Sequence, residues 1–124
     1  MFALVVLSNL IIPVIMFIAG LALFKYPPHE VNSLVGYRTR MSMKNKDTWE
    51  YANKLCGKIW MRLGAVMIPI SLIAVLFFKN AEEDVLSKFM TAMELIQLAL
   101  LLGTIPIVEK ALRNTFDKNG LRKK

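Results

Sequence analysis

Residues 1–24 contain no charged side chain, and this feature constrains the fold more than any other. A helix needs about 20 mostly apolar residues to cross the hydrocarbon core of a bilayer. Residues 63–78 are also uncharged, and residues 89–108 carry a single charge, Glu94. The whole chain is 56% apolar, with a mean hydropathy of +0.48. The sequence therefore predicts an all-α membrane protein with one domain over residues 1–124 and transmembrane helices near 3–24, 59–78 and 88–108.

A cleaved signal peptide is the alternative interpretation of the first segment. Such peptides have a basic region, a short apolar core and then a small-x-small cleavage site. Residues 1–24 have no basic residue, a longer apolar stretch and no clear cleavage site before Lys25. We therefore expect the segment to remain as a span.

The Lys and Arg residues fall mainly on one side of the predicted spans. Eight lie between Lys25 and Arg62 and six follow Glu109, whereas the other side has Lys79 and Lys88. Cytoplasmic segments of membrane proteins carry the excess of Lys and Arg. We therefore expect the loop 25–58 and the C-terminus in the cytoplasm and the N-terminus outside. The same rule explains the basic charge without direct nucleic-acid binding, for which no motif is present.

Local signals divide the loop between the first two spans. Pro27-Pro28 ends the first helix, and a short interfacial helix is expected to begin at Pro28 and to end just before Gly36. Asp47 and Glu50 have capping-box spacing, so a long second helix of about 30 residues is expected to begin there and extend into the cytoplasm. The third helix is expected over 85–108, with a helical tail that frays toward Arg122.

Polar groups inside the spans form one candidate cluster. Glu94 is an acid within a span, and such groups are costly and often functional. Asn9 and Gln97 lie at a similar predicted depth, so the three could form a polar cluster between helices. In the alternative interpretation, Glu94 lies near the interface and reaches Lys88 or water.

Small residues on the second helix have a packing role in our interpretation. Gly57 and Gly64 lie near one helix face, and small residues let membrane helices approach closely. Asn53 can add a hydrogen bond to the loop backbone.

The run Gly36-Tyr37-Arg38-Thr39 is the most specific candidate for binding. Gly36 permits a turn that other residues resist, and the Arg38 guanidinium suits phosphate or carboxylate. Tyr37 combines an apolar ring with a polar tip. The plainer interpretation is a positively charged loop with an anchoring Tyr, and the residues alone leave both open.

No catalytic or metal-binding pattern accompanies this run. Cys56 and His29 are the only residues of their types, and the motifs HExxH and GxSxG and a phosphate-cradling loop do not occur. We expect no catalytic residues, no metal site and no cofactor.

A spaced set of residues surrounds the run: Asn32 before it, and Ser42, Trp49, Asn53 and Gly57 after it. In this order the set resembles the SdpI family of bacterial membrane proteins, over about residues 31–64. The resemblance implies an immunity protein of the bacterial cell membrane that protects against a secreted toxic peptide. It also implies a receptor that holds a cytoplasmic transcriptional repressor at the membrane.

The leading hypothesis is a non-catalytic immunity or signalling protein. Its binding residues would be Asn32, Gly36, Tyr37, Arg38, Thr39, Trp49 and Asn53, and its partners would be membrane lipids, a toxic peptide and a repressor. One alternative is a small membrane enzyme or transporter acting on a phosphate-bearing lipid or peptide. Another is an accessory subunit of a larger membrane complex. Three spans make a thin bundle, so a homo-oligomer is also open.

Overall fold

The computed structural model describes residues 2–26 and 36–123. They form three helices, α1 (Phe2–Lys25), α2 (Lys46–Leu76) and α3 (Glu83–Thr115). All three are long and apolar enough to cross a membrane. The prediction of an all-α protein with three membrane-crossing helices is therefore confirmed. Outside the helices, the described residues make one isolated β-bridge, between Phe116 and Arg122.

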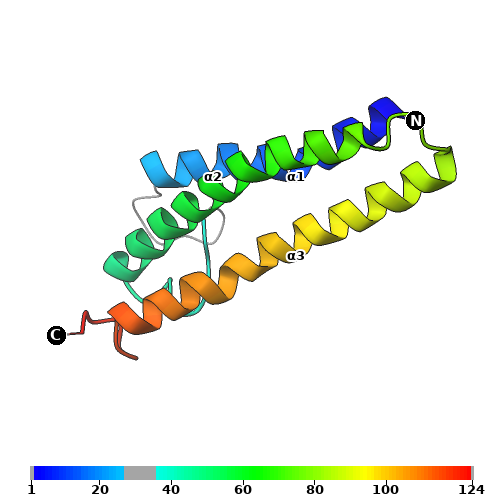
Figure 1. Cartoon of the computed structure of the whole chain (residues 1–124). Coiled ribbons are helices and arrows are strands. Elements are labelled where there is room, and N and C mark those ends of the chain that lie inside the picture. The colour runs from blue at the N-terminus through cyan, green and yellow to red at the C-terminus, as the bar shows by residue number, and fades with distance from the viewer. Residues whose placement is uncertain (1, 27–35, 124) are drawn as a thin grey trace.

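The helices run up, down and up again (Figure 1). The N-terminus lies beside the turn between α2 and α3, and the C-terminus lies at the other end, near residues 36–45. We call this second end the basic end, because most Lys and Arg residues belong to its segments. The opposite end is called the turn end.

The start of α2 differs from the sequence prediction. The N-cap is Asn45, not Asp47, and the helix has 31 residues. Asn45 Oδ1 accepts from the Thr48 backbone N–H at 2.8 Å, and Thr48 Oγ1 accepts from the Asn45 N–H at 3.1 Å. This reciprocal pair satisfies the first helical N–H groups. The Asp47 carboxylate is instead paired with Arg122 of the tail.

Helix α3 continues past the predicted span to Thr115, so the expected helical extension is present. The expected fraying toward Arg122 is wrong. The segment folds back, with hydrogen bonds from Asp117 N to Leu121 O (2.8 Å) and from Lys123 N to Thr115 O (2.9 Å). Gly120 permits the reversal because its φ is +82°.

The buried side chains gather in two apolar clusters with a polar layer between them. The cluster at the basic end contains Tyr37, Ala52, Cys56, Val108, Leu112 and Phe116. The cluster at the turn end contains Val5, Val75 and Leu86. Asn9, Ser71 and Gln97 are buried between them. Polar contacts therefore join the three helices in the middle of the bundle.

Two sequence predictions lie outside the described residues. The short interfacial helix was expected to begin at Pro28 and to end just before Gly36, so all of it lies outside the described residues. Asn32 lies in the same segment.

Three glycines bring the backbones of α1 and α2 into contact. A Cβ at Gly57 would lie 2.5 Å from Phe24 N and 2.6 Å from Gly20 O. One at Gly64 would lie 2.7 Å from backbone atoms of α1, and one at Gly20 would lie 2.5 Å from backbone of α2. The packing role predicted for Gly57 and Gly64 is therefore confirmed, with Gly20 as their counterpart on α1.

Replacing Gly57 by Ala should lower the unfolding temperature of the purified protein in detergent. The new methyl group would overlap backbone atoms of α1, which cannot move away as a flexible side chain can. Overpacking of this kind costs about 1–3 kcal/mol. Gly103→Ala is the matched control, because no atom of the described residues lies within 4 Å of a Cβ built there. Equal unfolding temperatures for the two variants would contradict the close contact.

Candidate functional site

Gly36 begins the described part of the loop and turns the chain inward. Its φ of +104° lies in the left-handed region, which favours glycine. Tyr37 follows and is 8% exposed, within the apolar cluster at the basic end. The turn at Gly36 therefore places an aromatic ring between the helices.

Tyr37 ties the loop to both α2 and α3. Its backbone N–H donates to Asn53 Oδ1 at 2.7 Å, and its hydroxyl donates to the Glu109 carboxylate at 2.7 Å. The first bond confirms the predicted contact of Asn53 with the loop backbone. Burial, followed by the hydrogen bond to Glu109, raises the pKa of Tyr37, so the phenol stays protonated and remains a donor.

Thr39 and Ser42 close a tight turn after Tyr37. The Thr39 N–H donates to Ser42 Oγ at 2.8 Å, and the Ser42 N–H donates to Thr39 Oγ1 at 3.2 Å. The Ser42 hydroxyl lies 3.1 Å from the Tyr37 carbonyl oxygen. The two hydroxyl groups therefore satisfy backbone N–H and C=O groups of the loop, which have no helical hydrogen-bond partner.

Trp49 and Asn53 lie near the N-terminus of α2. Both side chains are fully buried on the first two turns of α2. Asn53 Nδ2 donates to the Trp49 carbonyl at 2.9 Å, while Asn53 Oδ1 holds the Tyr37 N–H. Asn53 is therefore bonded through both ends of its amide, which suits a bracing role.

Arg38 and Arg40 are exposed, whereas Tyr37 between Gly36 and Arg38 is buried. Among the predicted binding residues that the structure describes, Tyr37, Trp49 and Asn53 are thus buried, whereas Arg38 is exposed. The predicted binding role itself stays a prediction.

The C-terminal tail packs against the start of α2. Asn45 Nδ2 donates to the Gly120 carbonyl at 2.7 Å. Arg122 makes two hydrogen bonds to the Asp47 carboxylate, at 2.8 and 2.9 Å, and its guanidinium lies 5.1 Å from the centroid of the Phe116 ring. The tail therefore contributes to the same end of the molecule as the loop.

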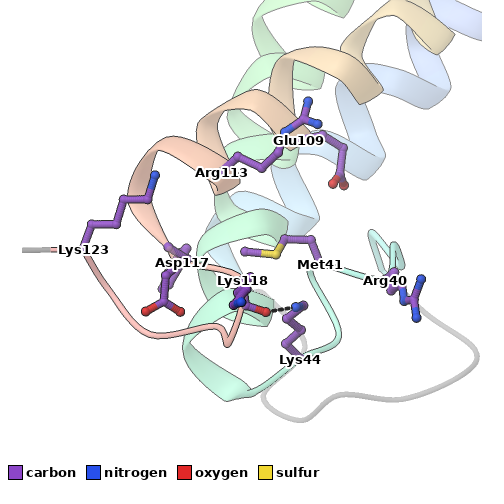
Figure 2. A pocket seen from close by; sticks show the side chains of 9 residues that line it. Arg40, Met41, Lys44, Glu109, Arg113, Asp117, Lys118 and Lys123 are labelled. Atoms are coloured by element: carbon purple, nitrogen blue, oxygen red, sulfur yellow. Dashed lines mark hydrogen bonds between the residues drawn. The ribbon is translucent and has the colours of Figure 1, made fainter.

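A hollow of about 700 Å³ opens between the loop, α3 and the tail (Figure 2). Its lining comprises five basic side chains, two carboxylates and two apolar side chains: Arg40, Lys44, Arg113, Lys118 and Lys123; Glu109 and Asp117; Met41 and Phe116. Figure 2 shows that the basic groups come from all three segments, with Lys44 Nζ donating to the Lys118 carbonyl. The excess of positive charge suits an anionic group that has apolar parts.

Glu109 is the site residue that the sequence analysis missed. It accepts from Tyr37 and also lines the hollow, so it joins the braced loop to the charged surface. No local pattern marks it, because its partner lies 72 positions away. The tail turn had a weak signal in Asn119-Gly120, a dipeptide typical of turns.

The predicted intramembrane cluster is only partly assembled. Gln97 Nε2 donates to the Asn9 carbonyl at 2.8 Å and to Ser71 Oγ at 2.9 Å. Glu94 is partly exposed, and no hydrogen bond or ion pair among the described residues joins it to Asn9 or Gln97. Asn9 Oδ1, Asn9 Nδ2 and Gln97 Oε1 have no hydrogen-bond partner within residues 2–26 and 36–123. The hydrogen bonds of the buried polar layer therefore come from Gln97. They join it to Asn9 and Ser71, whereas the sequence analysis had grouped it with Asn9 and Glu94.

Comparison with known proteins decides the family. The SdpI/YfhL protein family matches residues 29–108, which cover the loop, α2 and most of α3. The chain belongs to this family. The match confirms the resemblance found in Asn32 and the run from Gly36 to Thr39, and it includes both Tyr37 and Asn53.

A curated relative shows the same similarity over a shorter range. The uncharacterized protein YfhL of Bacillus subtilis (strain 168) is 36% identical over 59 residues, which are 48% of this chain and 54% of that protein. The aligned part thus spans about half the length of the relative. No solved structure matches the chain at a significant level.

Tyr37→Phe should destabilise the protein although the ring is kept. The variant removes the donor to Glu109, and hydrogen bonds to charged groups contribute about 1.5–3 kcal/mol. Thermal unfolding in detergent measures the effect. Tyr26→Phe is the matched control, because Tyr26 is 80% exposed. An unfolding temperature for Tyr37→Phe equal to that of the control would argue against the bracing role.

Asn9→Leu and Gln97→Leu should have opposite effects on stability. Leu at position 9 removes two buried polar atoms without partners and leaves the backbone acceptor in place, so the unfolding temperature should stay level or rise. Leu at position 97 removes two hydrogen bonds and should cost about 1–3 kcal/mol. A large loss for Asn9→Leu would mean that its amide holds a ligand or a water molecule.

Proposed function

We propose that this chain is a non-catalytic immunity protein that binds a secreted toxic peptide at the membrane. Membership of the SdpI/YfhL family supports a multipass membrane protein of that kind. The observation that carries the proposal is the bond of Tyr37 to both Asn53 and Glu109, which holds the loop rigidly beside a basic hollow. A preorganised loop binds at lower entropic cost than a loop that must order first.

The exposed part of the site would make the contact. Arg38 and Arg40 point outward from the braced turn, and Arg40 also lines the hollow. Guanidinium groups bind carboxylates and phosphates through two parallel hydrogen bonds. The apolar side of the hollow, formed by half-buried Met41 and buried Phe116, would accept apolar side chains of a membrane-active peptide.

The basic end would face the cytoplasm. Loop and tail carry most of the Lys and Arg residues, and Figure 1 shows that they lie at the same end of the bundle. The protein would therefore bind the toxic peptide after the peptide has entered the bilayer. Capture of a cytoplasmic transcriptional repressor is a second role that the family resemblance implies, and the same exposed surface would serve it.

Arg38→Ala should abolish protection while leaving membrane insertion intact. The Arg38 side chain is exposed, so its replacement should remove a contact with the peptide and leave the buried apolar clusters in place. The measurement is survival of a sensitive bacterial strain that expresses the chain and is challenged with the secreted toxic peptide of a family-bearing producer. Membrane fractionation measures insertion.

Lys79→Ala provides the control, because Lys79 is an exposed cation at the turn end. It should protect as well as the unchanged chain. Full protection by Arg38→Ala would overturn the assignment of Arg38. Absence of protection by the unchanged chain at normal membrane levels would overturn the proposed immunity function.

A further inference from the structure

A second hollow lies between α2 and α3, away from the loop. It has a volume of about 520 Å³, and its lining includes Ile59, Arg62 and Val66 of α2 and Ala99, Gly103 and Ile107 of α3. We call it the α2–α3 groove. Apart from Arg62, its lining is uncharged and mostly aliphatic. The groove lies within the part of the helices that is expected to cross the membrane, so its surroundings are lipid.

Gly103 lines the groove and leaves open space beside its backbone. The other helical glycines bring α1 and α2 into backbone contact, whereas none of residues 2–26 and 36–123 has an atom within 4 Å of a Cβ built at Gly103. Ala99 lies one turn before Gly103 and is also exposed. Residues four apart share a helix face, so these two small side chains leave a continuous depression along α3.

A positive charge lies at the end of the groove nearer the basic end. Arg62 is exposed and makes no hydrogen bond or ion pair with the residues that the structure describes. Helix side chains lean toward the helix N-terminus, which for α2 is the basic end. Lys110 follows Ile107 by three residues on the same side of α3 and leans toward the groove by the same rule.

We propose that the α2–α3 groove binds an anionic phospholipid. One acyl chain lies along Ala99 and Gly103, and the headgroup phosphate is held by the Arg62 guanidinium with Lys110 beside it. Basic groups at the cytoplasmic ends of transmembrane helices bind anionic headgroups in this way. A bidentate contact with phosphate suits Arg in particular.

A second copy of the chain fits the groove less well. Symmetric pairing through Gly103 would bring the Arg62 and Lys110 side chains of both copies toward each other. None of the residues that line the groove is acidic, so the repulsion would stay uncompensated. Charge complementarity therefore favours an anionic lipid over a second protein chain.

Native mass spectrometry of the full chain in detergent tests the proposal. Phosphatidylglycerol and phosphatidylcholine with identical acyl chains are added at equal concentration. The unchanged chain should retain phosphatidylglycerol preferentially. Arg62→Gln should reduce this preference about fivefold, because one basic residue near a headgroup contributes about 1 kcal/mol. Lys46→Gln removes an exposed charge at the same end of the molecule but outside the groove, and should retain the preference.

Gly103→Leu should fill the groove and reduce retention of both lipids. Leu98→Ala, an exposed position on another side of α3, is its control. Equal retention of the two lipids by the unchanged chain would overturn the proposal, and so would an undiminished preference in Arg62→Gln, which alters no buried contact. A dimer that carries no lipid and becomes a monomer in Gly103→Leu would also overturn it, and would identify a second copy as the occupant.

Discussion

The close backbone contact between α1 and α2 is the constraint on which the rest of the structure depends. Gly20, Gly57 and Gly64 remove the side chains that would separate the two helices. Within a bilayer the hydrophobic effect does not drive helices together, so close van der Waals contact of this kind must hold the pair. The paired helices form a rigid base, and α3 packs on one side of it.

The position of α3 determines where binding surfaces can form. At the basic end, Tyr37 fills the space between α2 and α3 and bonds to Glu109. Further along, on another side of α3, small residues leave the α2–α3 groove. The same helix therefore borders a charged hollow beside the loop and an apolar groove facing lipid. The two differ in chemistry because one lies beyond the apolar spans and the other lies within them.

The residues on which the family resemblance was found have mostly structural roles in this protein. Asn53 is bonded at both ends of its amide, and Trp49 is buried near the N-terminus of α2. Gly36 adopts a positive φ, and Tyr37 is held by hydrogen bonds to two helices. Such residues define the shape of the loop.

The sequence by itself determined the helices and the clustering of charge, because length, hydropathy and helix periodicity are local properties. It also indicated the contact of Asn53 with the loop backbone. The cap of α2 by Asn45 is a local pair with Thr48, where the sequence prediction had placed the start at Asp47. The tertiary structure alone decided that the tail folds onto Asp47 and that Ser71 rather than Glu94 joins Gln97. Those outcomes depend on contacts between residues far apart in the chain. Several partners were chemically suitable in each case, and only the packing of the helices brought one of them within hydrogen-bonding distance.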